Sequence, residues 1–162
     1  MLKYEFTNET KKVKDVFGGI HILRRIKALK DFYDVNKGDL GGWIEKESNL
    51  SQEGDCWVYG IAMVYGDAMV HDDAQVYNGA QVYGKAQVYD DAQVYDDAQV
   101  FGHAKIYDNA QVYGNAQVFG LSGVYDFAQV YGTAGVYGNA QVYGNAQVYD
   151  DAQVHGNAKI YD

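Results

Sequence analysis

The chain has 162 residues and a formal net charge of −9, and no apolar run approaches the roughly 18 residues of a membrane-spanning helix. The N-terminus also lacks the apolar core of a signal peptide, so we expect a cytoplasmic protein that does not contact a membrane. The charge is uneven: residues 1–53 carry 10 Lys and Arg against 9 Asp and Glu, whereas residues 54–162 carry 3 against 13. So acidic a segment repels phosphate, which argues against direct binding of nucleic acid.

Residues 1–53 show no regular repeat, and we expect them to form a small β-rich domain. Residues 3–7 alternate in polarity as a strand does, and residues 19–29 favour a strand over a short helix. Residues 38–42, Gly-Asp-Leu-Gly-Gly, are typical of a turn, because they lack the Lys-Ser/Thr pair of a phosphate-binding loop.

From Cys56 to Asp162 the sequence is a run of eighteen six-residue units, of which the commonest is Ala-Gln-Val-Tyr-Gly-Asn. An aliphatic residue recurs at every sixth position, Val in sixteen units and Ile in two, and a small residue stands two positions before it. Residues two apart on a strand point to the same side, so the small and aliphatic residues are expected to face inward together. The Gly, Asp or Asn that follows tolerates the positive φ of a tight turn. Each unit therefore predicts one short strand and one turn.

The turn residues decide how these strands are connected. Consecutive hairpins would impose a longer period of twelve residues, whereas a solenoid with three strands per coil would impose eighteen. Sorted by eighteen, the residue two positions after each aliphatic residue is always Gly in one column, and is Asp in a second column except at Gly144. The sequence therefore predicts an all-β fold: a three-sided parallel β-helix of six coils over residues 54–162. Residues 1–53 are expected to form a cap that covers its first coil.

The unit resembles the hexapeptide repeat of left-handed β-helix proteins, in which an aliphatic residue is followed by a small residue four places on. That resemblance implies a left-handed coil. The chain departs from the usual pattern because Tyr, Phe or His, and not Gly, directly follows the aliphatic residue. The repeat pattern A-x-V-Y-G-x, together with residues 37–45 and 49–51, more closely resembles repeat proteins of phages and prophages. Those proteins are often labelled acyltransferases because of the repeat alone. This resemblance implies a bacterial host cell as the location.

Hexapeptide acyltransferases typically work as trimers, with a catalytic His and a loop that leaves the coils to build the acyl-donor site. No loop interrupts the present repeat. His71 and His155 occupy the aromatic column, and the repeat places no carboxylate or nucleophile beside any histidine. His103 lies in a turn and His21 in the cap. We therefore predict no catalytic residue, no cofactor and no metal site, and we keep an acyltransferase as the alternative function.

Stacking at a spacing of eighteen gathers aspartates on one corner of the predicted solenoid. This acidic corner comprises Asp72, Asp73, Asp90, Asp91, Asp108 and Asp126. Aspartate suits such turns and its charge favours solubility, which is a sufficient structural explanation. The functional alternative is an anionic surface that attracts a basic protein. A calcium ladder is a third option, although the nine-residue motif of calcium solenoids is absent.

Departures from the repeat mark a second candidate surface. This irregular patch comprises Phe101, His103, Phe119, Leu121 and Phe127. Phe replaces Tyr in two adjacent coils, Leu121 replaces a polar turn residue, and Phe127 is an aromatic residue on the next corner. A less polar patch among polar ladders is typical of a partner or oligomer contact, although random drift would also produce it. The remaining Tyr and Gln columns are expected to form structural ladders.

The last coil suggests how two copies would assemble. The repeat stops in register, so unpaired backbone groups and apolar side chains are expected at that end of the solenoid. The residues concerned are Val148, Val154, Ile160 and Tyr161. Because open solenoid ends need a cover, we predict a homodimer stacked end to end. Side-by-side packing on the irregular patch, as in the trimers of the similar enzymes, is the alternative.

Charge, rigidity and resemblance together favour a non-catalytic acidic solenoid. We expect it to engage a basic or nucleic-acid-binding protein of the host, as a phage-encoded DNA mimic with an anti-defence role would. An acyltransferase is the first alternative function. A structural or assembly module, or an oligomer that sequesters a ligand, is the second.

Overall fold

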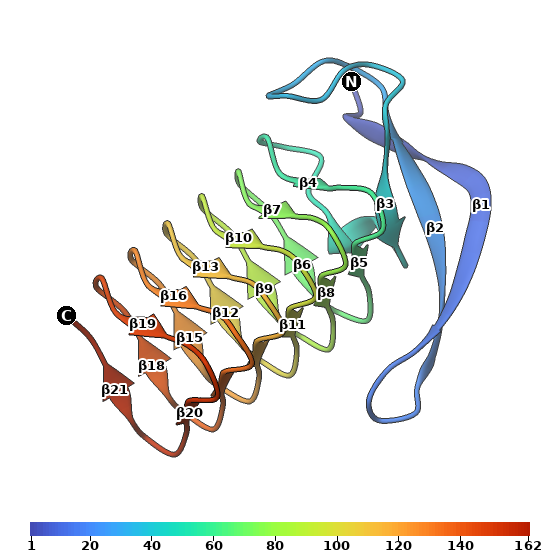
Figure 1. The fold of residues 1–162 in the computed structure, drawn as a ribbon. Coiled ribbons are helices and arrows are strands. Elements are labelled where there is room, and N and C mark those ends of the chain that lie inside the picture. The colour runs from blue at the N-terminus through green and yellow to red at the C-terminus, as the bar shows by residue number, and fades with distance from the viewer.

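The computed structural model describes all residues from 1 to 162 and consists almost wholly of strands and turns (Figure 1). Three strands precede the repeat, β1 (Tyr4–Lys14), β2 (Ile20–Ala28) and β3 (Leu40–Ile44), and a 3₁₀ helix (Glu47–Asn49) follows them. The remaining strands are two residues long: β4 (Trp57–Val58), β5 (Met63–Val64), β6 (Met69–Val70), β7 (Gln75–Val76), β8 (Gln81–Val82), β9 (Gln87–Val88), β10 (Gln93–Val94), β11 (Gln99–Val100), β12 (Lys105–Ile106), β13 (Gln111–Val112), β14 (Gln117–Val118), β15 (Gly123–Val124), β16 (Gln129–Val130), β17 (Gly135–Val136), β18 (Gln141–Val142), β19 (Gln147–Val148), β20 (Gln153–Val154) and β21 (Lys159–Ile160). None of these elements is a helix of the length and apolarity that crossing a membrane requires.

The strands form three sheets, which are the three sides of the solenoid (Figure 1). Sheet 1 has the order β1-β2-β3-β5-β8-β11-β14-β17-β20, sheet 2 the order β19-β16-β13-β10-β7-β4, and sheet 3 the order β21-β18-β15-β12-β9-β6. Repeat strands pair in parallel at a spacing of eighteen residues, as Val94 does with Val112. The predicted three-sided parallel β-helix is therefore confirmed.

The solenoid begins before the repeat does. Strand β3 pairs in parallel with β5, and Leu50 forms a parallel bridge with Val70. An incomplete turn, formed by β3 and the 3₁₀ helix, therefore precedes the coils of the repeat. The hexapeptide pattern did not indicate this turn, because residues 40–50 do not contain the unit.

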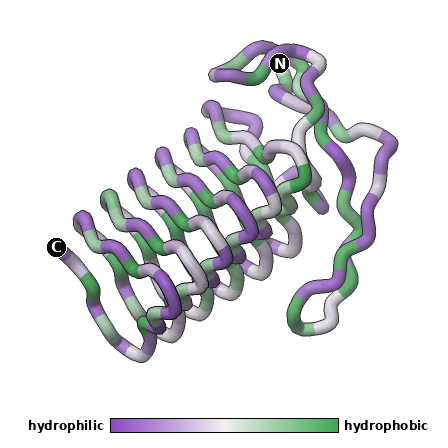
Figure 2. The backbone as a smooth tube through the Cα atoms, viewed as in Figure 1, coloured by the Kyte–Doolittle hydropathy of each residue, from purple (hydrophilic) through white to green (hydrophobic).

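The inward positions form one continuous core, as predicted. It contains 39 buried residues, most of them Ala and Val that alternate along the coils, and it loosens only in the last coil, where Ala152 is exposed. Ala116 and Val118, for example, are both 0 % exposed. Figure 2 shows hydrophobic segments recurring at the same place in each coil. Small and mid-sized side chains suit so narrow a prism, because protein interiors are close-packed and leave no space for larger groups.

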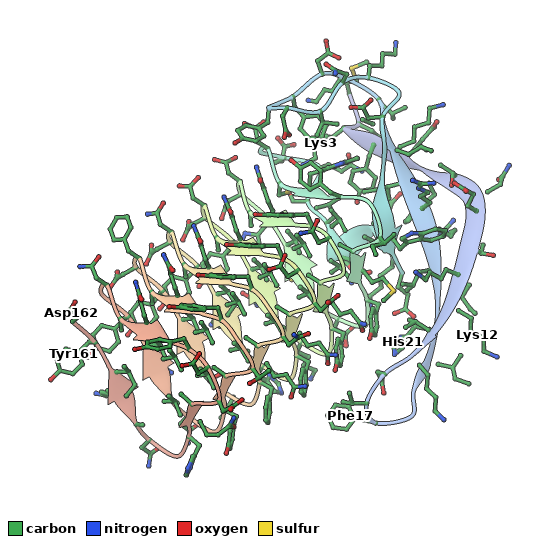
Figure 3. All side chains as sticks on the ribbon, viewed as in Figure 1. Lys3, Lys12, Phe17, His21, Tyr161 and Asp162 are labelled. Atoms are coloured by element: carbon green, nitrogen blue, oxygen red, sulfur yellow. The ribbon has the colours of Figure 1, made fainter.

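The outward aromatic side chains form the predicted ladders, and rows of side chains follow the solenoid in Figure 3. The rings of Tyr77 and Tyr95, one coil apart, are stacked with centroids 4.7 Å apart and an angle of 2°. On sheets 1 and 2, a tyrosine hydroxyl donates to the glutamine side-chain oxygen sixteen residues on, as Tyr95 does to Gln111 at 3.1 Å. Each coil is thus tied to the next by backbone, ring and side-chain contacts.

The N-terminal segment closes the first end of the solenoid. Strands β1 and β2 form an antiparallel hairpin, and β2 pairs antiparallel with β3, so the segment extends sheet 1. The buried Lys3 ammonium Nζ donates to the carbonyl oxygens of Cys56 at 2.8 Å and Gly54 at 3.2 Å. Burial lowers the pKa of Lys3. Because sheet 2 has no strand beyond β4, this ammonium satisfies backbone carbonyls that the edge would otherwise leave unpaired.

The hairpin extends further along the solenoid than a cover for the first coil would. Phe17 lies at the hairpin tip (Figure 3), and its ring meets Phe101 edge-on with centroids 6.3 Å apart. Leu23 of β2 joins the buried cluster of Tyr65, Tyr83 and Phe101. The hairpin therefore covers one aromatic ladder as far as the third coil of the repeat.

Candidate functional site

Three hollows on the solenoid coincide with three departures from the repeat. The second turn residue of each unit is polar or Gly except at Ile61, Leu121 and Phe127. These side chains are 64 %, 61 % and 61 % exposed, and each lines a different hollow. The irregular units therefore shape the surface of an otherwise uniform prism.

The hollow beside Leu121 is a groove of about 530 Å³ at the corner between sheets 1 and 3, here called the His103 groove. One wall is a column of turn residues eighteen apart, Lys85, His103 and Leu121. Their backbone N–H groups donate to carbonyls of the following coil at 2.7–2.8 Å, which holds the column in place. The facing wall is the outward column of sheet 3, namely Gln87, Lys105, Gly123 and Gln141.

The His103 groove combines positive charge with a missing side chain. Lys85 and Lys105 are two of the three lysines in residues 54–162, where aspartate otherwise dominates. Gly123 stands where the repeat usually has Gln, and a Cβ there would lie 2.5 Å from Oε1 of Gln141. The neighbouring Ser122 is no free nucleophile, because its buried hydroxyl donates to the carbonyl oxygen of Phe119 at 2.7 Å. The two lysines thus suit the binding of an anionic group, next to the His103 imidazole, which makes no hydrogen bond of its own.

The four histidines differ in what their rings contact. His71 lies 3.0 Å from the Asp72 carboxylate and stacks on Tyr89, and His155 stacks on Tyr137. His103 has neither a carboxylate nor a ring partner, and its side chain is exposed to the groove. Of the four, it is therefore the one that has neither kind of partner and also lines a groove.

His21 has the most elaborate surroundings. Its Nε2 lies 2.9 Å from Asp15 Oδ2, its Nδ1 lies 2.8 Å from Glu45 Oε2, and its ring packs on Tyr65. Burial opposes protonation of the imidazole, but the two hydrogen-bonded carboxylates outweigh it, and the pKa of His21 is raised. The hydrogen bond to His21 lowers the pKa of Asp15. This cluster fastens the hairpin to the solenoid and leaves no ring nitrogen for a substrate.

Sequence reasoning placed no carboxylate beside His21, because the cluster joins three parts of the non-repeating segment. One signal did point to it. Asp15 is followed by Gly18 and Gly19 between two alternating runs, which is hairpin chemistry. In the structure Asp15 Oδ1 accepts hydrogen bonds from the backbone N–H groups of Phe17 and Gly19, so this aspartate orders the turn.

The acidic corner lies between sheets 3 and 2, and its two aspartate columns have different surroundings. The first residues of the turn take positive φ, 53° at Asp108. The carboxylates of Asp90, Asp108 and Asp126 accept backbone N–H groups of the next coil, whereas that of Asp72 contacts His71. Asp126 N donates to Asp108 Oδ2 at 3.2 Å, and Asp108 N to Asp90 Oδ2 at 3.3 Å. Asp73 and Asp91, in the second column, line a hollow of about 480 Å³ with Phe127. The first column, which also contains Asp72, is thus built into the turns.

The irregular patch is divided by the structure. His103 and Leu121 line the groove described above, whereas Phe127 faces the acidic corner. Phe101 is only 8 % exposed, because Phe17 of the hairpin and the neighbouring rings cover it. Phe119 is half-buried in the same ladder. Phe101 is therefore not available to a partner, and the five residues do not form one open surface.

At the C-terminal coil, β19, β20 and β21 are the last strands of their sheets, and each has one edge without a strand partner in this chain. Val148 and Val154 remain largely buried, at 4 % and 9 % exposed, whereas Tyr161 is 66 % exposed. Ile160 is half-buried against the core. The end of the core is thus partly open, since Ala152 of the same coil is exposed.

The comparisons with known proteins concern the repeat. Residues 140–156 match the family model described as the YdcK beta solenoid repeat. A segment of 38 residues, 24 % of this chain, is 55 % identical to the Escherichia coli (strain K12) protein named "Uncharacterized acetyltransferase YdcK". The matched segment spans 12 % of that relative's length. The resemblance to hexapeptide-repeat β-helix proteins is confirmed.

These matches do not extend to the details of a site. Of the residues that line the His103 groove, only Gln141 lies within residues 140–156. No group of three or more His, Cys, Asp or Glu side chains is arranged to hold a metal ion. Burial raises the pKa of the Cys56 thiol, which keeps it protonated. The comparisons therefore concern the repeat and not the residues of the His103 groove.

Proposed function

We propose that this chain is an acyltransferase of the hexapeptide-repeat type that works in the His103 groove. One observation carries the proposal: the histidine without a carboxylate or ring partner lies in a hollow that also contains two of the solenoid's three lysines. The match to a relative named an acetyltransferase supports the choice of an acyl thioester as the donor class.

The groove contains the groups that such a transfer needs. His103 would accept the proton of an acceptor hydroxyl or amine as that group attacks the thioester carbonyl. The new C–O or C–N bond forms, the C–S bond breaks, and the thiolate leaves and takes up a proton. Lys85 and Lys105 would attract the phosphates of a coenzyme A thioester. Gly123 adds no side chain to the groove floor, where the Gln141 amide lies, and that amide offers a hydrogen-bond donor to the substrate.

The test measures thiol release from acetyl-coenzyme A with a panel of small amines and alcohols as acceptors. His103→Asn is expected to lower kcat by about 10²–10⁴-fold, as loss of a general base does. His155→Asn, which changes an exposed histidine outside the groove, is the matched control. Lys105→Gln should raise KM with little effect on kcat. Equal turnover by the two histidine variants contradicts the proposal.

We infer a second candidate function from the hollow at the acidic corner. There Asp73 and Asp91 lie in the same column of turn residues as the exposed ring of Phe127, with Asn109 between them and the ring, and no hydrogen bond engages the carboxylate of Asp91. A row of carboxylates that leads to an exposed apolar ring suits a basic protein, including a nucleic-acid-binding protein of a bacterial host. Capture from host lysate at low salt and release at high salt support this function. Capture by an Asp73→Asn, Asp91→Asn, Phe127→Ser variant that equals wild type opposes it.

A further inference from the structure

One ring breaks the regularity of the ladder on sheet 2. From Tyr77 to Tyr149 successive rings stack with centroids 4.7–5.5 Å apart and angles of at most 15°. Tyr59, the first residue of the ladder, stands edge-on to Tyr77 at 83°, with centroids 6.2 Å apart. The two rings therefore form a right-angled aromatic corner where the other coils have a parallel stack.

The cap causes this break. The Tyr59 hydroxyl donates to Asp34 Oδ1 at 2.7 Å, in the loop between β2 and β3. That loop is held in place by Phe32, whose ring packs on Trp57 with centroids 5.2 Å apart. The regular partner of Tyr59 would be Gln75, sixteen residues on, by analogy with Tyr77 and Gln93. Turning Tyr59 toward Asp34 thus leaves the side-chain amide of Gln75 without a hydrogen-bond partner.

A cavity of about 660 Å³ lies at this corner. Tyr59 and Tyr77 line it together with Ile61, the exposed aliphatic residue that replaces a polar turn residue. Polar groups of Asp34 and Gln75 also line it. Asp34 offers carboxylate oxygens as acceptors, and the free Gln75 amide offers a donor beside an acceptor. Flat apolar walls and a few converging polar groups are the usual make-up of a small-molecule site.

We propose that this cavity binds a flat heteroaromatic ring that carries an amino group beside a ring nitrogen, as aminopurines and aminopyrimidines do. The ring would lie face-on to one tyrosine and edge-on to the other, the two geometries that aromatic pairs prefer. One N–H of the amino group donates to Asp34. The other N–H donates to the side-chain oxygen of Gln75, and the NH₂ group of Gln75 donates to the adjacent ring nitrogen. Because Asp34 belongs to the cap, the site is complete only when the cap is docked. It lies at a different corner from the His103 groove and does not depend on acyl transfer.

The experiment titrates the full chain with adenine and, separately, with purine, which lacks the amino group, by isothermal calorimetry. One site per chain is expected, with adenine bound at least about tenfold more tightly than purine, because a hydrogen bond to the charged Asp34 carboxylate is stronger than one between neutral groups and purine lacks the amino group that makes it. Tyr77→Leu should weaken adenine binding by about tenfold or more, because a base–aromatic stack is lost. Tyr113→Leu, in the same ladder but outside the cavity, should bind as wild type does.

A more conservative variant tests the same site with little risk that the chain misfolds. Tyr59→Phe keeps the ring but removes the hydroxyl that Asp34 holds, so the ring is free to stack on Tyr77 and close the corner. Adenine affinity should then fall about tenfold in a chain with an unchanged circular dichroism spectrum. Wild-type protein that binds neither probe, equal binding of adenine and purine, or equal affinity of the Tyr59→Phe and wild-type chains would each overturn the proposal.

Discussion

Replacing Asp108 with alanine is expected to destabilise the solenoid, because its carboxylate belongs to the turn. Asp108 has φ of 53°, and its Oδ2 accepts the backbone N–H of Asp126 at 3.2 Å. Alanine in the left-handed region costs roughly 1–2 kcal/mol, part of which aspartate already bears. The lost hydrogen bond adds about 0.5–1.5 kcal/mol. Together these predict a loss of about 2 kcal/mol, or a fall in Tm of about 4–8 °C for a chain of this size.

Two matched variants make the result decisive. Asp108→Asn keeps an acceptor oxygen and tolerance of positive φ while it removes a charge stacked on Asp90 and Asp126, so Tm should hold or rise. Asp91→Ala changes an exposed aspartate of the same corner without positive φ and should shift stability by less than about 0.5 kcal/mol. Thermal unfolding followed by circular dichroism measures all three. If Asp108→Ala and Asp91→Ala melt together, the turn explanation fails, and recognition would have to account for the whole aspartate column.

Three further outcomes are expected. Ala116→Leu should overpack the core and cost roughly 1–3 kcal/mol, whereas Gln117→Leu, exposed on the next position, should change little; equal melting of the two contradicts the inward assignment. The pKa of His21 is raised in the folded chain, so protonated His21 stabilises the fold. This stabilisation is complete below about pH 6.5, the pKa of an unfolded histidine, and is lost as the pH rises through the pKa of the folded state. Hydrogen exchange in β1 and β2, corrected for intrinsic rates, should therefore accelerate at high pH in wild type but not in His21→Asn. If the free edges of β19–β21 pair with a second copy, light scattering will report a dimer, and a monomer would rule that assembly out.

The repeat made the solenoid predictable because every level of the sequence agrees. The spacing of Ala and Val gives a strand facing inward, and the eighteen-residue columns of Gly and Asp distinguish three sides from hairpins. The cap could not be predicted in the same way. Its contacts join residues far apart in a non-periodic segment, as Lys3 does with Cys56 or His21 with Glu45. Patterns of neighbouring residues do not predict such long-range pairs.

The candidate sites, in contrast to the fold, lie at positions where the sequence departs from the repeat. Phe119 lacks the hydroxyl of a ladder tyrosine, and Gly135, sixteen residues on, lacks the glutamine that would accept it. Donor and acceptor are thus absent together, which leaves no unpaired group behind. Where one partner of such a pair is turned elsewhere, the other is freed: Gln75 loses Tyr59 to Asp34 and lines a cavity. A regular solenoid pairs its own polar side chains from coil to coil, so an amide without a protein partner beside an aromatic corner is a group that a ligand can engage.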